Sequence, residues 1–316
     1  MSSSKSFLET ALGKISKKYS NLPISGLDLF IESESLGMAI IFDSRNSNAY
    51  PEGKTIFFKY ENDKKGLKVT WLRSDKNRKE TWKNQDFTTS FFKDFEIVLG
   101  SVPLKISNVS ANFFEGNPTF LNKLNGIFEI TPKIRSESVE IGINSEAEII
   151  GILRCFDAES LKVIVVKSPG DSNENIVIDR VAELEQWKRA EHLQMNDINV
   201  TAEVGKFAHF KNASIGFVEF PMSHVDALKE IFITSPTPQR FEILSATNLD
   251  IIHELIMNYG PTFKDVEGNR TRKSWFFSIP NRNDEIIRIS SYTLLLEFRR
   301  IPEAEVPRGA NIISKF

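Results

Sequence analysis

Short runs of branched and aromatic residues recur along the first quarter of the chain, each bounded by turn-forming residues. Val, Ile, Phe and Tyr suit a pleated, half-buried surface, whereas Gly, Asn, Asp and Ser interrupt strands. Four segments fit this pattern: LDLFIE (27–32), MAIIF (38–42), KTIFFKY (54–60) and LKVTWL (67–72). The connection ENDKKG between the last two is typical of a hairpin loop. The sequence therefore predicts antiparallel strands here.

The rest of the chain mixes further strands with helices. Strand-like alternation or apolar runs occur at 95–99, 102–109, 138–144, 162–166, 198–204, 274–279 and 286–298. Helices are expected where apolar residues recur every three or four positions beside an end signal. They are 6–19 after the capping box of Ser6 and Glu9, 119–126 closed by Gly126, 179–195 capped by Asp179, a helix opened by Ser223 and Asp226, and 248–259 closed by Gly260.

These elements follow no regular strand–helix–strand rhythm, and no internal repeat is found. We therefore predict a β-rich α+β protein with mostly antiparallel sheets and a few short helices. Its 316 residues are enough for two domains, and we predict an N-terminal domain over 1–132 and a C-terminal one over 133–316. Charge changes near that boundary: 54–93 holds eleven basic and five acidic residues, whereas 129–203 holds eight basic and fifteen acidic ones.

Composition excludes several classes of protein. With 41% hydrophobic and 26% charged residues and a net charge of -2, the chain is neither disordered nor globally basic. The one cysteine, Cys155, lies in the apolar run GILRCF and is expected to be a buried small residue. Neither a signal peptide nor an apolar run of bilayer length is present, so we expect a soluble, cytoplasmic protein without a membrane span.

Motifs for cofactors and metals are also missing. No two of the 16 glycines are separated by one residue, which excludes a G-x-G-x-x-G dinucleotide turn, and there is no G-x-S-x-G elbow. The four histidines show no i, i+4 pair, and one cysteine cannot build a thiolate zinc site. The sequence identifies no catalytic residue, and we expect no cofactor and no bound metal.

One arrangement has the order of a magnesium-dependent nuclease site. Asp43 is followed by Glu52-x-Lys54, where two carboxylates could hold Mg²⁺ and the lysine could orient water. A second acidic-x-Lys triplet occurs at 63–65. About three such triplets are expected by chance in this composition, so their number adds no support.

The densest local combination of aromatic and basic residues lies between residues 71 and 83. Cations neutralise phosphates and aromatic rings stack on bases, so this combination is typical of a nucleic-acid groove. A solvated basic loop with its tryptophans in the core, or a contact for an acidic protein, would use the same residues. The candidate residues are Trp71, Arg73, Lys76, Arg78, Lys79, Trp82 and Lys83.

Phenylalanine doublets occur at 57–58, 91–92, 113–114 and 276–277. Adjacent strand residues face opposite sides, so a doublet places aromatic surface on both faces of a sheet. Either both faces are covered internally or one meets a partner. Together with the absent catalytic motifs, this favours a non-catalytic interaction or assembly protein, a subunit of a larger complex or a self-associating chain. The alternative is a nucleic-acid-binding protein, and the nuclease is a third reading.

Overall fold

The computed structural model describes residues 24–42, 54–64, 66–73, 76–82, 85–101, 105–114, 118–130, 132–168, 175–245, 248–267, 270–292 and 295–314. The chain forms two compact units. The first unit is Met1–Lys162 with Ser168–Asp171, and the second unit is Val163–Lys167 with Ser172–Phe316. The predicted boundary between one domain over 1–132 and another over 133–316 stays a prediction.

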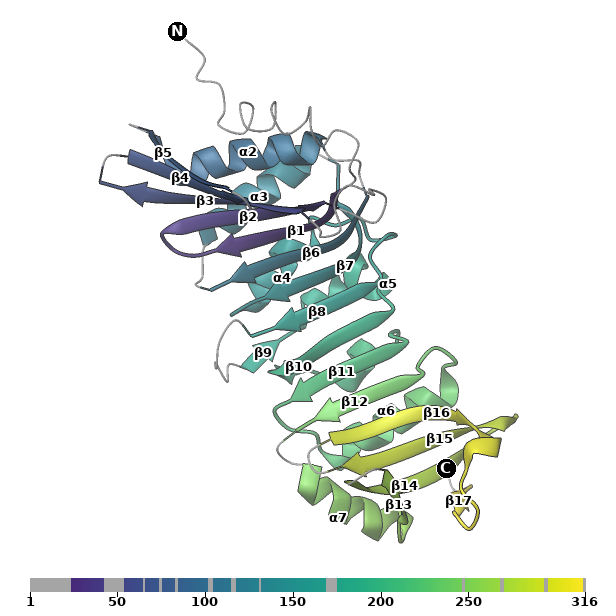
Figure 1. Cartoon of the computed structure of the whole chain (residues 1–316). Coiled ribbons are helices and arrows are strands. Elements are labelled where there is room, and N and C mark those ends of the chain that lie inside the picture. Colours follow the sequence, from purple (N-terminus) through teal and green to yellow (C-terminus); the bar gives the residue numbers. More distant parts are fainter. Residues whose placement is uncertain are drawn as a thin grey trace. The chain divides into compact units, whose positions relative to one another are not determined.

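The sheet of the first unit begins as an antiparallel meander and continues in parallel (Figure 1). Its spatial order is β5-β4-β3-β2-β1-β6-β7, and the last two strands run parallel to β1. The strands are β1 Ile24–Ile31, β2 Ser35–Phe42, β3 Lys54–Asp63, β4 Gly66–Arg73, β5 Lys76–Trp82, β6 Lys105–Phe113 and β7 Arg135–Gly142.

Three of the described helices belong to this unit (Figure 1), and buried aromatic side chains of two of them contact aromatic residues of the sheet. The helices are α2 Phe87–Ser101, α3 Pro118–Ile130 and α4 Glu146–Leu153. Phe91 of α2 stacks on Phe95 at 5.9 Å between ring centroids and meets Tyr60 of β3 edge-on at 5.5 Å. The Tyr60 hydroxyl donates to Asp94 at 2.7 Å, and burial together with that carboxylate raises the pKa of Tyr60.

In the second unit, β8, β9, β10, β11 and β12 pair in parallel, and the later strands pair mainly antiparallel. The strands are β8 Val163–Lys167, β9 Asn175–Val177, β10 His192–Thr201, β11 Asn212–Phe217, β12 Arg240–Leu244, β13 Phe263–Glu267, β14 Arg270–Ile279, β15 Arg282–Tyr292, β16 Leu295–Pro302 and β17 Ile312–Ile313. The helical segments are η1 Val181–Glu183, α5 Glu185–Arg189, η2 Val204–Phe207, α6 Met222–Thr234, α7 Asn248–Tyr259 and η3 Glu303–Glu305.

The pairing confirms a sheet-rich α+β architecture but shows mixed sheets. Antiparallel ladders join β1 to β5 and β12 to β16, as the sequence predicts. Parallel ladders join β1, β6 and β7, and again β8 to β12. Helices such as α3 and α6 make the crossovers that parallel neighbours require. This alternation of strands and crossover helices could not be recognised from sequence, because the segments that connect the parallel strands differ in length and helix content.

One predicted element is wrong in kind, and others are correct in kind but wrong in extent. The strand expected at 95–99 lies inside α2, where Phe91, Phe95 and Val98 form a buried helical face. Gly126 does not end α3, which runs on to Ile130. The predicted strand 286–298 is two strands, β15 and β16, paired antiparallel. By contrast, α7 ends where predicted, at Gly260 with a φ of 84°.

The helix predicted over 179–195 is also wrong in extent. Only η1 and the five-residue α5 are helical there, and the chain enters β10 at His192. Asp179 does not cap a helix; its carboxylate accepts a hydrogen bond from Lys206. Trp187, which the pattern placed on an apolar face, is indeed fully buried.

The phenylalanine doublets divide into three cases. Phe276 and Phe277 in β14 are both buried, so both faces are covered at that strand. Phe91 and Phe92 are buried on a helix, where the two-face argument does not apply. Phe58 and Phe113 are buried, while Phe57 is half-buried and Phe114 is 48% exposed. Cys155 is buried as expected, and burial raises its pKa to about 12.

The helix predicted over 6–19 lies outside the described residues. Among the helices that are described, none has the length and apolar character needed to cross a bilayer.

Candidate functional site

The predicted basic segment forms a strand pair at the end of the first unit's sheet. Trp71 and Arg73 belong to β4, and Lys76, Arg78, Lys79 and Trp82 belong to β5. The antiparallel register places Trp71 opposite Arg78, Arg73 opposite Lys76, Thr70 opposite Lys79 and Leu67 opposite Trp82. We call residues 71–83 the basic hairpin; Lys83 lies outside the described residues.

Of the seven candidate side chains in the basic hairpin, those of Trp71 and Lys79 can be placed. Trp71 lies opposite the fully buried Phe58 of β3 and is half-buried, with an indole Nε1 that has no hydrogen-bond partner in the described part of the chain. Lys79 is exposed. Trp71 therefore shares the core-facing side of β4, and nucleic-acid contact by the hairpin stays a prediction.

The nuclease candidates are mostly outside the described residues. Asp43 and Glu52 fall there, and Lys54 is described only as the first residue of β3. Within the described ranges, no group of three or more His, Cys, Asp or Glu side chains is placed to hold a metal ion. The nuclease reading gains no residue from the structure and is left as a prediction.

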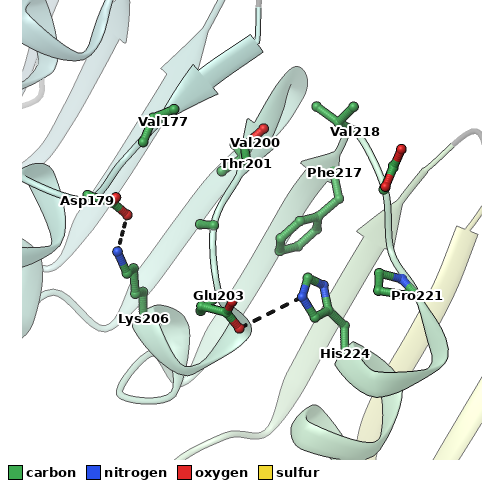
Figure 2. A pocket seen from close by; sticks show the side chains of 12 residues that line it. Val177, Asp179, Val200, Thr201, Glu203, Lys206, Phe217, Val218, Pro221 and His224 are labelled. Atoms are coloured by element: carbon green, nitrogen blue, oxygen red, sulfur yellow. Dashed lines mark hydrogen bonds and ion pairs between the residues drawn. The ribbon is translucent and has the colours of Figure 1, made fainter.

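A pocket that the sequence analysis did not predict lies in the second unit, at the carboxyl ends of parallel strands (Figure 2). Its volume is about 670 Å³. In open α/β sheets, ligands usually bind outside the carboxyl ends of the strands. Its lining residues are Val177, Asp179, Val200, Thr201, Ala202, Glu203, Lys206, Phe217, Val218, Glu219, Pro221 and His224.

A bulge in β10 and a glycine in β11 position the pocket. The register of β10 against β11 shifts between Met195 and Asn199. There the backbone carbonyl of Ile198 comes so close to Gly216 that a Cβ on this residue would lie 2.4 Å from the oxygen. Only glycine permits that approach without a backbone shift. The next residue, Phe217, then enters the pocket wall.

The short helix η2 carries Lys206, directly follows Glu203 and packs on buried aromatic residues. Its Val204 and Phe207 are buried, and Phe207 packs against Trp187 with 6.0 Å between ring centroids. The Trp187 indole donates to the carbonyl of Lys206 at 3.2 Å. His209 donates from Nε2 to the carbonyl of Trp187 at 2.8 Å, and burial lowers the pKa of this histidine.

The charged groups of the pocket form two contacts. Lys206 of η2 pairs with Asp179, which follows β9 (Figure 2). The Nε2 atom of His224 lies 4.0 Å from a carboxylate oxygen of Glu203. Glu203 is largely exposed, with 83% of its side-chain surface accessible, whereas that fraction is 20% for His224.

His224 stands in the first turn of α6 between aromatic rings. Phe217 and Phe220 meet its ring edge-on, at 6.0 Å and 5.6 Å between centroids. Its Nδ1 atom is buried and has no hydrogen-bond partner among the described residues. The ring is thus held by packing on one side while Nε2 faces the acidic side of the pocket (Figure 2).

The pocket combines apolar walls with carboxylates at its mouth. Sequence reasoning overlooked it because its residues come from four separate segments between 177 and 224. The sequence signal that could have pointed to the pocket is the alternation over 198–204, where the chain passes from the end of β10 into a turn.

Together, the units and the pocket define a sheet-rich α+β chain with a ligand-sized pocket beside parallel strands. Residues 118–257 match the family model of the FTH domain. The matched segment begins in α3, ends in α7 and includes every residue that lines the pocket. It covers less than half of the chain, so the similarity concerns this segment. Comparison with curated proteins and with solved structures found no match.

Proposed function

We propose that the chain is a non-catalytic interaction protein of the cytoplasm that works as a subunit of a larger complex. The observation that carries this proposal is the similarity of residues 118–257 to the FTH domain, a family of F-box-associated domains. A domain that accompanies another module fits an interaction role better than a stand-alone enzyme.

Exposed apolar side chains give secondary support. Among the described residues, the large apolar side chains that stay exposed are Leu72, Phe114, Val177, Ile256 and Met257. Met257 is 73% exposed, and with Ile256 it lies on the solvent side of α7. Scattered single residues of this kind are ordinary on a protein surface, so they only add to the argument from the FTH match.

Two measurements on the full chain test the proposal. Affinity capture from cells, followed by reconstitution with purified components, should yield a partner in fixed stoichiometry. Light scattering at tens of micromolar should reveal self-association if the basic 54–93 segment of one copy binds the acidic 129–203 segment of another. A monomer that yields no stoichiometric partner would remove the proposal.

A second candidate function is nucleic-acid binding by the basic hairpin. Its support is the density of cations on one strand pair, where Arg73 pairs directly with Lys76 and Thr70 pairs with the exposed Lys79. Labelled DNA and RNA, single- and double-stranded, should bind at about 50 mM salt and dissociate at about 200 mM. Charge reversal by Arg78→Glu with Lys79→Glu should weaken that binding.

A matched control makes the nucleic-acid test specific. Lys211 and Arg308 are exposed cations in the second unit, so Lys211→Glu with Arg308→Glu changes the net charge by the same amount. If both double variants lose affinity equally, the binding is general electrostatics and not a property of the hairpin. Cleaved product in Mg²⁺ would instead revive the nuclease prediction at Asp43, Glu52 and Lys54.

A further inference from the structure

We propose that the pocket at the ends of β9, β10 and β11 binds a cationic side chain, arginine or lysine, presented by a protein partner. This inference rests on the proposed interaction function and names the chemistry that the partner must carry.

The charges of the pocket favour a cation. Its one lysine, Lys206, is already paired with Asp179 and is not free to bind an anion. Glu203 lies 4.0 Å from the imidazole of His224, and that contact neutralises the carboxylate only when the ring is protonated. Glu219 is an exposed carboxylate on the same lining. An incoming guanidinium or ammonium group would supply the missing counter-charge.

The walls of the pocket suit the aliphatic part of such a side chain. Val200 and Phe217 are buried at its base, and Val218 and Pro221 line it further out. Long basic side chains bury their methylene groups on apolar surface while the charged end reaches polar partners. The volume of about 670 Å³ exceeds what one side chain needs and leaves room for flanking residues.

The mouth of the pocket indicates a macromolecular partner as the source of the cation. Asp179 and Glu203 keep 63% and 83% of their side-chain surfaces exposed, so the carboxylates stand at the entrance. Val177 at the rim is 47% exposed and offers apolar contact to a residue next to the cation. A free amine would use the carboxylates alone and leave this rim uncovered.

The direct test uses a defined probe and nuclear magnetic resonance of the full chain with labelled valine methyl groups. N-acetyl-arginine amide and N-acetyl-lysine amide, at millimolar concentration, should shift the signals of Val177, Val200 and Val218 saturably. N-acetyl-citrulline amide has nearly the shape of the arginine probe but no charge. Equal shifts with citrulline would overturn the proposal, and the two cationic probes decide between arginine and lysine.

The matched variants are Glu203→Gln with Glu219→Gln, against Glu303→Gln with Glu305→Gln. The control pair lies in η3, is also exposed and removes the same charge. The pocket pair should weaken binding of the cationic probe about tenfold and the control pair less than about twofold. Equal affinity for the wild-type chain and the pocket pair would overturn the proposal.

Failure of this inference can be told apart from failure of the proposed function. If the pocket variant binds a purified stoichiometric partner as tightly as the wild-type chain does, the interaction function stands and the pocket proposal is wrong. If the probe binds but no stoichiometric partner is found, the pocket retains its cation specificity and the source is a small amine, which overturns the assignment to a protein partner.

Discussion

The basic hairpin and the pocket of the second unit are assembled in opposite ways. The hairpin takes all its residues from thirteen consecutive positions, and its two strands need only each other to bring them together. The pocket takes its residues from β9, β10, β11 and the segments after them, which a parallel sheet must first align. A site whose residues are close together in the sequence is therefore easy to recognise from sequence, whereas a site that the fold assembles from distant residues is not.

The position of the hairpin also offers a plain reason for its charge. Among the described strands, β5 pairs only with β4, so it is an edge strand. Edge strands expose unpaired backbone groups, and lysine on them prevents pairing with other chains. Lys76 and Lys79 would be useful there without any ligand. Glu203 and Glu219 of the pocket follow β10 and β11, which pair with a strand on each side, so edge protection does not explain these two charges.

The largest expected effect comes from a residue remote from the pocket. Arg300 of β16 is buried and donates to the carbonyls of Phe232 at 2.5 Å, Ser235 at 2.7 Å and Pro238 at 3.2 Å. These contacts hold the C-terminal end of α6 in place, and the first turn of the same helix carries His224. Arg300→Met should lower the free energy of unfolding by about 3–5 kcal/mol, since buried carbonyls lose their donor.

Hydrogen exchange measures this effect separately in the two regions. In Arg300→Met, exchange should accelerate in β11, α6 and β12 and stay unchanged in β4 and β5. Arg299→Met is the control, because Arg299 is the exposed neighbour on the same strand. Equal acceleration in both regions would show that the hairpin depends on the second unit and would break the comparison.

A smaller effect is expected at the glycine that fixes the pocket. In Gly216→Ala, the new methyl group would lie 2.4 Å from the carbonyl oxygen of Ile198 and 3.2 Å from that of Asn196. Because backbone must move, we expect a loss of about 1–3 kcal/mol and shifted valine methyl signals in the pocket. Gly205→Ala in η2 has no atom within 4 Å of the new Cβ. Similar losses in both variants would contradict the close-approach argument.

Local patterns predicted most elements, and failures came where a longer-range contact decided. The strands of the first meander were predictable because apolar alternation and turn residues agree there. Residues 95–99 were misread because the short segment FEIVL fits a strand and a helix equally; the spacing of Phe87, Phe91 and Phe95 shows the helix. Residues 286–298 contain no Gly, Pro, Asn or Asp to mark a turn, so local sequence did not predict that they divide into the antiparallel pair β15 and β16.

The candidate sites follow the same division. All seven candidate residues within the basic hairpin were named from sequence, and the structure places six of them on one strand pair. None of the pocket residues was named as a site. Asp179 was even assigned a capping role, because a sequence cannot show that Lys206, 27 residues later, will reach it.

A capping residue of the first unit should have a more modest effect. Asp86 precedes α2, and its carboxylate accepts hydrogen bonds from the backbone and the hydroxyl of Thr89, both at 2.7 Å. Burial would raise the pKa of Asp86, but these hydrogen bonds outweigh it and lower the pKa. Asp86→Ala should cost about 1 kcal/mol in urea unfolding, while Asp86→Ser should retain most of the stability. Probe binding at the pocket should not change; if it weakens, the two regions are coupled.

The smallest expected effect is a pH dependence of the free energy of unfolding that arises at His209 in the second unit. Burial lowers the pKa of His209 below its ordinary value, although its hydrogen bond to the Trp187 carbonyl opposes this. The unfolded chain therefore binds the proton more readily, and stability should fall as pH drops below about 6.5. Above that pH, both states hold a neutral ring and the contribution is constant.

His209→Gln removes this titration and retains a side-chain N–H that could reach the Trp187 carbonyl. Between pH 7.5 and pH 5.5, the wild-type chain should lose more stability in urea unfolding than this variant does. His253→Gln, at an exposed position of α7, should behave like the wild-type chain. If all three chains lose the same stability, protonation of His209 does not weaken the support of η2.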